Sequence, residues 1–480
     1  MAKPTIKLLA ESELKAIHDT SLRILNDVGM VVHHAEVLNR LAEAGANVDF
    51  DKKRARFSEA LVTWALESAG KQFVLQGRDP DQVARFGYGD LNLMSSPGQY
   101  AWLDHKTGQR RDPTLADARA AIKLGDALTN ITVVGAMSVP QDVPPQMFDV
   151  ILAAELVQLT GKPTRCWNVD RRSSRYMLEI YQAIAGGKAA LRQTPMFVTF
   201  LEPISPLQLP ASGLDVLFEF IDYAQPVAIG PMAMASGTAP ATLAGTLAQE
   251  NAEILGGIVT VQVLGPGTPI TYGGIPHIMD PRTSICSFGS PEQGLMAIAM
   301  TELGKYYGLP VYVNVNLTDS KLLDGQMGLE KMGSFVLGIL SGADEFGHAG
   351  LVGTDHGGSL PWLVADNEAI SYARRLARGF SVDDDTLAGP VIADIGPAGN
   401  YLAHEHTLRH FREELWIPGQ LWTRDSYDGW VGKGETDFHQ RVVSEVQHIL
   451  ASHEPAPLDP ALKREIDRIV ATARKDLVGN

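Results

Sequence analysis

The chain has 480 residues, of which 45% are apolar and 20% charged, a composition typical of a folded globular enzyme. Its net charge is −15, from 41 basic and 56 acidic residues, and this argues against nucleic acid as a partner because phosphate binding needs a basic face. The length allows two domains, or one large α/β barrel with additions.

Two features predict a cytoplasmic protein. Cys166 and Cys286 are too few for a disulfide framework and suit a reducing compartment. The N-terminal residues 1–20 lack the apolar core of a signal peptide, and no apolar run approaches the roughly 18 residues of a membrane-spanning helix. We therefore expect no membrane segment.

Residues 1–130 do not follow one repeating pattern. Two helical patterns, at 11–32 and 35–49, precede short strands, another helix and a loop with glycine and aromatic residues at 92–104. We interpret this region as an N-terminal α+β cap.

From residue 131 onward, short apolar runs alternate with amphipathic helical patterns. Gly161 and Gly308 follow two of these patterns, as helix C-caps do. The eight apolar runs are 131–139, 164–169, 195–201, 226–234, 269–274, 311–317, 343–350 and, least clearly, 390–396. Repetition of strand and helix predicts an α/β fold, a (β/α)8 TIM barrel over residues 131–420. Aromatic turns and helical patterns over 421–480 predict a C-terminal helical extension.

The sixth run, VYVNVNL, ends in a dense group of polar residues. In a parallel barrel the carboxyl ends of the strands carry the chemistry. Asn314 and Asn316 share one face of a strand by its period of two, and Asp319, Lys321 and Gln326 follow in the loop and the first helical turn. The simpler alternative is that Asp and Ser residues here only cap the next helix.

Further candidates follow the other runs. A lining of aromatic and acidic side chains suits a quaternary ammonium group through cation–π contact, although each aromatic residue taken alone is more often a core residue. The candidates are Tyr100, Trp167, Glu202, His277, Glu345 and His348. His348, Glu345 and Asp355 could ligate a metal, but their spacing matches no zinc motif, so we expect no bound metal. The chain also lacks a Walker A loop, a G-x-S-x-G elbow and an H-E-x-x-H motif.

Several distinctive segments are spread over nearly the whole chain. They lie at 102–131, 205–208, 237–259, 267–296, 306–331 (with DSKLLDGQMGLEK) and 406–419 (HTLRHFREELWIPG). In these segments the chain resembles the trimethylamine methyltransferase superfamily in its non-pyrrolysine branch, which includes glycine betaine:corrinoid methyltransferases. The fold of that family is a TIM barrel. Its archaeal trimethylamine enzymes carry pyrrolysine, and this chain has only standard residues, which favours a quaternary amine.

The resemblance implies a reaction and a partner. A separate corrinoid protein presents Co(I), which takes a methyl group from the amine, and glycine betaine would leave as dimethylglycine. A quaternary nitrogen is already activated because the departing tertiary amine is neutral. We expect Glu202, Tyr100, Trp167 and Glu345 to hold the cation. His348, His277, Asn316 and Lys321 would hold a carboxylate, and Asp319, Lys321 and Gln326 would lie on the loop that faces the corrinoid.

Other readings fit the same sequence. The substrate could be another N-methyl compound such as proline betaine, carnitine or choline. The chain could also be a zinc-dependent methyltransferase acting on a weaker electrophile, or a non-catalytic protein that binds quaternary amines. A homo-oligomer is possible in each case.

Overall fold

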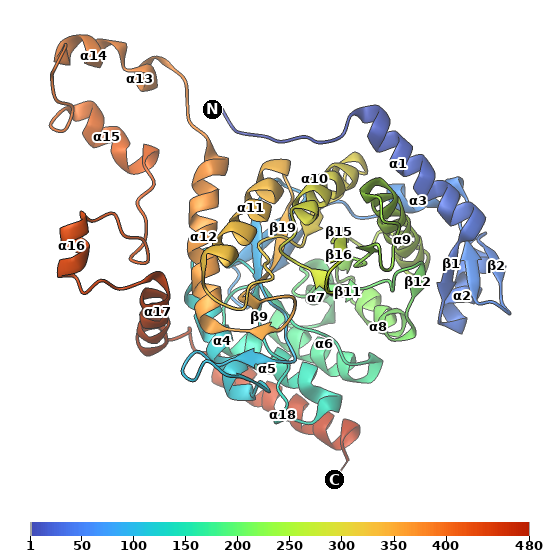
Figure 1. Ribbon diagram of the computed structural model, residues 1–480. Coiled ribbons are helices and arrows are strands. Elements are labelled where there is room, and N and C mark those ends of the chain that lie inside the picture. Colours follow the sequence, from blue (N-terminus) through green and yellow to red (C-terminus); the bar gives the residue numbers. More distant parts are fainter. Residues whose placement is uncertain (1, 480) are drawn as a thin grey trace.

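A parallel β-sheet forms the centre of the computed structural model, which describes residues 2–479 (Figure 1). Its six strands lie in the order β11-β13-β15-β18-β19-β6, and every neighbouring pair is parallel. The bounds are β11 (Thr199–Leu201), β13 (Val227–Ile229), β15 (Ile270–Gly274), β18 (Val311–Val313), β19 (Glu345–Ala349) and β6 (Asn92–Ser95). These strands are mostly buried on both faces, which is why they read as short apolar runs in the sequence.

Two further parallel strands continue this arrangement. A single bridge from Met94 to Val133 leads from β6 to the pair β9 (Val134–Gly135) and β10 (Thr164–Arg165). Among residues 2–479 no strand pairing joins β10 to β11, but the Thr199 hydroxyl donates to the Asn168 side-chain oxygen at 3.3 Å across this gap. The predicted α/β fold with a parallel sheet is confirmed, whereas closure into a complete barrel stays a prediction.

Helices cover the outside of the sheet. They follow the strands in the alternation that the sequence predicted. Their bounds are α4 (Leu115–Ala127), α5 (Phe148–Leu159), α6 (Arg171–Ala185), α7 (Lys188–Gln193), α8 (Ala211–Asp222), α9 (Leu243–Leu264), α10 (Pro291–Tyr306), α11 (Gly325–Ser341) and α12 (Leu360–Arg378). Side-chain caps begin several of them: Ser290 for α10 and Asp324 for α11 accept hydrogen bonds from backbone N–H groups of the first turn.

The first ninety residues pack against one side of this core. Helices α1 (Glu11–Arg23) and α3 (Glu59–Ser68) contact α9. A small sheet in the order β12-β1-β3-β2 joins β1 (Met30–Val32), β2 (Asn47–Asp49) and β3 (Arg54–Arg56) to β12 (Gln208–Leu209), and α2 (Ala35–Glu43) also packs on α9. A hairpin of β4 (Phe73–Gln76) and β5 (Val83–Phe86) completes the region. The division into domains at residues 130 and 420 stays a prediction.

Two small sheets lie where the strands end. One, in the order β20-β21-β7-β8, joins β20 (Leu351–Val352) and β21 (Gly357–Gly358) to the hairpin of β7 (Trp102–Leu103) and β8 (Arg110–Arg111). The other joins β14 (Met234–Ala235), β16 (His277–Met279) and β17 (Cys286–Ser287). Loops that follow different strands are thereby fixed to one another.

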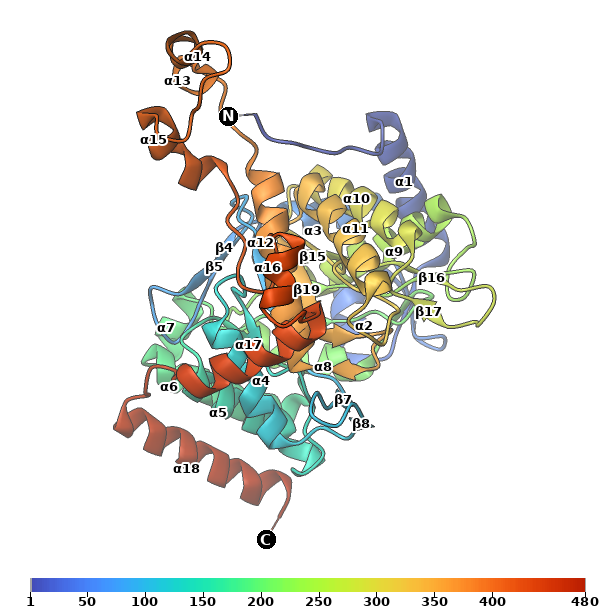
Figure 2. The same ribbon diagram turned by 60° about the vertical axis from the view of Figure 1, so that its left-hand side comes forward.

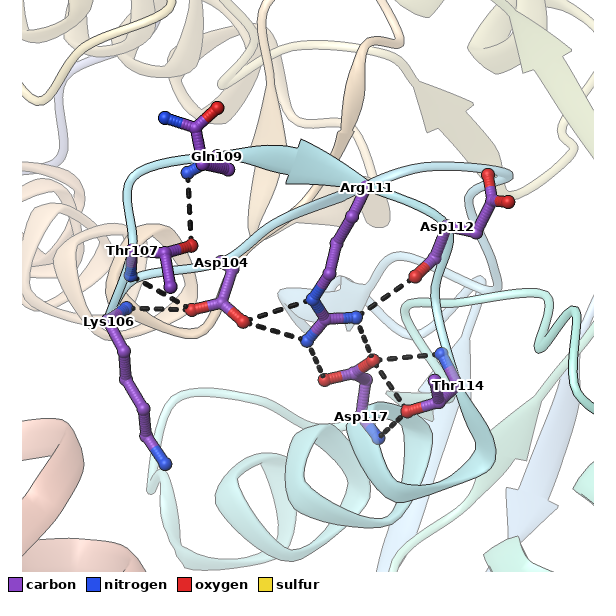
Figure 3. A network of polar contacts seen from close by, with 8 residues as sticks. All are labelled: Asp104, Lys106, Thr107, Gln109, Arg111, Asp112, Thr114 and Asp117. Carbon is purple, nitrogen blue, oxygen red and sulfur yellow. Dashed lines mark hydrogen bonds and ion pairs between the residues drawn. The ribbon is translucent and has the colours of Figure 1, made fainter.

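Arg111 anchors the β7–β8 hairpin (Figure 3). Its guanidinium donates to both oxygens of Asp117 at 2.7 and 2.8 Å, and to Asp104 at 3.0 Å. Asp117 also accepts from the backbone of Thr114, completing a capping box at the start of α4. The two carboxylates raise the pKa of Arg111, which stays charged. The segment directly before β7 is therefore held in a defined position.

Two sequence predictions about strands were wrong. Run 390–396 forms helix α14 (Gly389–Ile395), which begins with a proline in its first turn and has no buried residue. A central strand would instead be buried on both faces. Its place beside β19 is taken by β6, from the stretch that we had interpreted as a loop of the cap. The sequence signal failed because Asn92 and Ser95 make β6 look polar, although both are buried.

The C-terminal part leaves the body and returns to it. Helices α13 (Asp384–Leu387), α14, α15 (Glu405–Glu414) and α16 (Tyr427–Gly432) follow α12, and α17 (Phe438–Ser452) packs on α12 and α4. The last helix, α18 (Pro460–Leu477), packs on α5 and α6. No helix in the described part of the chain is long and apolar enough to cross a membrane.

Candidate functional site

A cavity of about 370 Å³ lies at the carboxyl ends of the parallel strands. This volume falls in the range of small-molecule pockets. It is lined by Met94, Pro97, Gly98, Gln99, Tyr100, Arg165, Trp167, Asn168, Phe200, Glu202, Met232, Ile275, Phe288, Tyr312, Asn314, His348 and Asp355. Five residues named as site candidates from the sequence are among them: Tyr100, Trp167, Glu202, Asn314 and His348.

Aromatic rings make up one wall of the cavity. Trp167 is fixed by a hydrogen bond from its indole N–H to the Gly98 carbonyl oxygen at 2.8 Å. Its ring lies 6.0 Å from that of Phe200, edge-on, and Phe200 lies 6.3 Å from Tyr312. Tyr100 stands at the rim and is 67% exposed. The wall thus presents several π faces to a ligand, as recognition of a quaternary ammonium group requires.

Two carboxylates, Glu202 and Asp355, face the same space. Both reach the open part of the cavity, but the walls around them limit contact with bulk water. This desolvation raises the pKa of Glu202, and the neighbouring charge of Asp355 raises it further. Desolvation also raises the pKa of Asp355, against the effect of a hydrogen bond from Gln99. A cation bound between them would favour the ionised form of both.

Arg165 lies at the floor of the cavity and is 3% exposed. Its Nη1 donates to Glu345 Oε1 at 3.0 Å, and its guanidinium is 5.5 Å from the Phe200 ring and 5.9 Å from the Tyr312 ring. Burial raises the pKa of Glu345, although Arg165 opposes this rise. Glu345 is thus not on the cavity wall, as expected from sequence, but behind Arg165.

The two histidines are neutral at ordinary pH. Burial lowers the pKa of His348 to about 3, and the charge of Arg165 adds to this effect. Burial also lowers the pKa of His277 to about 4. His348 lines the cavity from a backbone position with φ of +68°, at an irregularity in β19. His277 lies behind Phe288, with the two rings 4.6 Å apart, so it does not reach the cavity wall. His348 can act as a neutral hydrogen-bond partner only.

The stretch after β18 differs from its sequence interpretation. The strand ends at Val313, and Asn316 adopts a left-handed backbone with φ of +64°. The alternation of faces therefore stops. Asn314 lines the cavity and Asn316 does not, and the backbone N–H of Asn316 donates to the Ser334 hydroxyl of α11 at 3.2 Å. The prediction that Asn314 and Asn316 share a face was wrong for this reason.

Asp319 connects three loops at the rim. Its carboxylate accepts from the Phe288 backbone N–H at 2.7 Å, from the Thr354 hydroxyl at 2.6 Å and from the Ser287 hydroxyl. Burial acts to raise the pKa of Asp319, but these hydrogen bonds outweigh it and lower the pKa. Asp319 therefore holds its neighbours in place and does not itself line the cavity.

Lys321 and Gln326 lie further out. The ammonium group of Lys321 donates to the backbone oxygen of Asp319 at 2.6 Å, and the amide of Gln326 donates to Glu330 at 2.9 Å. Neither lines the cavity. Their expected role toward a corrinoid stays a prediction.

Sequence reasoning missed Arg165, Phe200, Tyr312 and the site role of Asp355. An arginine inside a buried apolar strand is itself a signal, because an arginine is rarely fully buried unless it is paired. The ligand atoms of Glu345, His348 and Asp355 do not all lie within 4.8 Å of one another. Within residues 2–479 one group of three ligands has atoms within 4.8 Å of one another, Asp385, His406 and His410, and it lies in α13 and α15.

Comparison with known proteins adds the family. The family model for trimethylamine methyltransferase (MTTB) matches residues 1–478. The chain is 30% identical over 477 residues to a glycine betaine methyltransferase from Desulfitobacterium hafniense strain Y51, covering 99% of this chain and 98% of that protein.

Two further relatives are similar over most of their length. The trimethylamine methyltransferase MttB of Desulfitobacterium hafniense strain DCB-2 is 32% identical, covering 96% of this chain and 92% of the relative. The crystal structure of the monomethylamine methyltransferase MtmB from Methanosarcina barkeri has a TM-score of 0.53 at 11% identity and covers 92% of each chain, a likeness of fold alone. The chain belongs to the trimethylamine methyltransferase family and is a methyltransferase.

Proposed function

We propose that this methyltransferase takes a methyl group from a small quaternary amine that carries a carboxylate, of which glycine betaine is the simplest, and works with a corrinoid protein in the cytoplasm. The observation that carries the proposal is the cavity itself. Aromatic rings and two carboxylates line its wall, and an arginine lies at its floor. A betaine has a cationic and an anionic end, and the cavity offers a complement to each.

The cationic end fits the wall. A quaternary ammonium group has no N–H donor, so hydrogen bonding cannot select it. Trp167 and Phe200 offer π faces, and Glu202 and Asp355 offer negative charge. Protonated trimethylamine needs an acceptor for its N–H, and Glu202 offers one. The wall alone therefore favours cations in general and does not distinguish a quaternary amine from protonated trimethylamine.

The anionic end fits the floor. Arg165 uses one of its five N–H groups on Glu345 Oε1, and its guanidinium borders the cavity. His348 adds a neutral hydrogen-bonding group beside it. A carboxylate held there points the trimethylammonium group toward the rim. Arg165 thereby replaces Lys321 and His277 as the proposed carboxylate partner.

The rim suits a large partner. A corrinoid supplies Co(I), a strong nucleophile toward a methyl group. Tyr100 and Asp355 flank the opening, on segments held together by the sheet β20-β21-β7-β8. A partner that covers this opening would exclude water, and the chain would position the methyl group without any proton transfer.

Closure of the barrel belongs to the same proposal. Trp167 follows β10 and Phe200 lies in β11, and their edge-on contact, together with the Thr199–Asn168 hydrogen bond, spans the gap between these strands. We infer that the eight strands form one ring around the cavity.

The test uses purified protein and chemically reduced cob(I)alamin without oxygen. Glycine betaine, choline, carnitine and trimethylamine are supplied one at a time, and the demethylated amine is quantified together with the cobalamin spectrum. Formation of dimethylglycine from betaine, with little turnover of choline or trimethylamine, is expected. Turnover of trimethylamine in preference to betaine would contradict the proposal. Tight betaine binding without turnover, even with added corrinoid protein, would favour a binding protein.

A further inference from the structure

Residues 380–437, here called the arm, extend away from the body of the molecule (Figures 1 and 2). The arm contains α13, α14, α15 and α16, and none of these helices has a buried residue. A segment that buries so little apolar surface does not offset the entropy lost when it is ordered. Disulfides or bound metal ions often supply the missing stability, and the arm contains no cysteine.

Two histidines lie on one face of α15. His406 and His410 are four residues apart, which places them one above the other on the helix, and their ring centroids are 4.3 Å apart. The same spacing lets a helix offer two imidazole ligands to one metal ion. Both histidines belong to the distinctive segment 406–419, and neither lines the cavity at the strand ends.

Asp385 of α13 lies against both rings. The distance from His410 Nε2 to Asp385 Oδ2 is 3.0 Å, and the distance from His406 Nε2 to the Asp385 backbone oxygen is 3.1 Å. One ligand atom from each of the three side chains lies within 4.8 Å of the other two. Two ligands of a tetrahedral zinc ion, each about 2.0–2.1 Å from the metal, are about 3.3 Å apart. The three side chains are therefore close enough to share one ion.

The Nε2 atom of His410 gives a second, independent observation. It is buried and has no hydrogen-bond partner among residues 2–479, because its 3.0 Å contact with Asp385 lacks the geometry of a hydrogen bond. Buried polar atoms are normally satisfied, so an orphaned nitrogen calls for a missing partner. A metal ion beside the Asp385 carboxylate would supply that partner.

Arg409 is the cation that competes for the same carboxylate. It donates to Asp385 Oδ1 at 3.2 Å and to Oδ2 at 3.5 Å. Both side chains are about half exposed, and an exposed ion pair adds little stability. A carboxylate can also ligate a metal through one oxygen while the other accepts from an arginine, which orients the ligand. Arg409 is thus compatible with a bound ion.

The ligand types select the ion. Two imidazoles and one carboxylate suit Zn²⁺, whereas Mg²⁺ and Ca²⁺ prefer oxygen ligands alone. The arm has eleven Asp and Glu residues against four Lys and Arg, so its field attracts a divalent cation.

We propose that Asp385, His406 and His410 bind one zinc ion, which fastens α13 to α15 and fixes the shape of the arm. Water completes the tetrahedron, because the protein gives three ligands. The ion is structural and lies outside the cavity at the strand ends, so it takes no part in methyl transfer. The inference is therefore independent of the proposed function.

The test uses the full chain without an affinity tag, stripped of metal with a chelator. Calorimetric titration with Zn²⁺ and with Mg²⁺ measures affinity, and mass spectrometry of the dialysed protein measures zinc per chain. The ligand variants are Asp385→Asn and His410→Asn. The controls are Arg409→Ala, which removes the competing cation from the same helix, and His448→Asn, at an exposed histidine of α17. Circular dichroism checks that each variant is folded.

The wild type is expected to bind one zinc ion per chain and no Mg²⁺. Each ligand variant should weaken zinc binding at least about tenfold to a hundredfold, and both controls should bind as the wild type does. Zinc should also slow tryptic cleavage of the arm in the wild type and leave cleavage of His410→Asn unchanged.

Three results would overturn the proposal. One is a wild type that binds no zinc. Another is zinc binding that survives both ligand variants, which would place the ion elsewhere, for instance at the cavity. The third is zinc that binds at these residues without protecting the arm from trypsin, because the ion would then not fix its shape.

Discussion

Two ion pairs are buried within residues 2–479, and their surroundings differ. Lys331 and Asp366, each 1% exposed, lie between α11 and α12. The ammonium group of Lys331 donates to both carboxylate oxygens at 2.9 and 2.8 Å, and the Gly350 backbone N–H donates to Asp366 at 2.7 Å. This pair is hydrogen-bonded almost completely within the protein.

The pair of Arg165 and Glu345 is not fully hydrogen-bonded within the protein. A single contact of 3.0 Å joins it, and Glu345 Oε2 is buried without a hydrogen-bond partner among the described residues. The remaining face of the guanidinium borders the cavity. Buried polar groups are normally satisfied, so unused capacity next to a cavity indicates a binding site, whereas a saturated pair indicates a structural role.

The largest effect is expected on stability, at Lys331. Replacing Lys331 by Met leaves Asp366 buried and unpaired, and we expect the free energy of unfolding to fall by about 3–5 kcal/mol. The double variant Lys331→Met with Asp366→Leu should recover at least half of this loss, because no charge is left unpaired. Urea denaturation followed by circular dichroism measures both. A loss below about 1 kcal/mol in the single variant would remove the distinction between the two pairs.

Arg165 should instead affect ligand binding. Arg165→Met is expected to weaken betaine binding about a hundredfold, close to 3 kcal/mol, because a buried carboxylate loses its charged partner. Choline, which has the same ammonium group and no carboxylate, should lose less than about threefold by the same argument. Calorimetric titration of both ligands gives the ratio. Arg165→Lys, which keeps the charge, is the control, and an equal loss for the two ligands would show that Arg165 acts only on the shape of the cavity.

The sequence predicted much of the sheet, for a physical reason. Strands buried on both faces, such as β13 and β18, need continuous apolar runs, and these are visible in one sequence. Whether a segment is buried, however, is not visible in the sequence. Residues 390–396 are as apolar as a strand, yet they form helix α14, which has no buried residue, and β6 is buried despite Asn92 and Ser95. Only the packing around these segments separates the two cases.

The site was predicted in part for the same reason. Trp167, Glu202 and His348 lie at or near the ends of apolar runs, so position along the chain was enough to find them. Asn316 was misplaced because one left-handed residue reverses the alternation, and a period of two does not anticipate it. Arg165 was missed because it lies within a strand, and its role depends on Glu345, 180 residues away.

Varying the pH tests the role of Glu202, because its raised pKa makes the charge of its carboxyl group depend on pH. Below that pKa the carboxyl group is neutral, and above it the anion attracts the ammonium group. The KM for betaine should therefore fall as pH rises through the raised pKa. Glu202→Gln, neutral at every pH, should reduce this fall to the part that Asp355 contributes and leave KM about fivefold higher at high pH, equal to about 1 kcal/mol.

Steady-state rates over a range of pH provide the measurement. His348 and His277, with pKa values of about 3 and about 4, stay neutral above these values and should add no inflection near neutral pH. A KM that is independent of pH in the wild type would mean that Glu202 does not contact the cation.

The smallest effect is expected at the rim, at Lys321, which lies two residues from Asp319 and makes different contacts. Asp319→Asn should lower kcat/KM by about threefold to tenfold, because a weakened hydrogen bond to Phe288 or Thr354 lets cavity-lining groups move. Lys321→Ala should change it less than twofold, since the exposed ammonium group reaches only a backbone oxygen. Rates measured with a corrinoid protein distinguish positioning from docking. A larger loss for Lys321→Ala than for Asp319→Asn would place Lys321 against the corrinoid protein, as its position after the sixth apolar run first suggested. The binding surface would then extend from the cavity to the loop between β18 and α11.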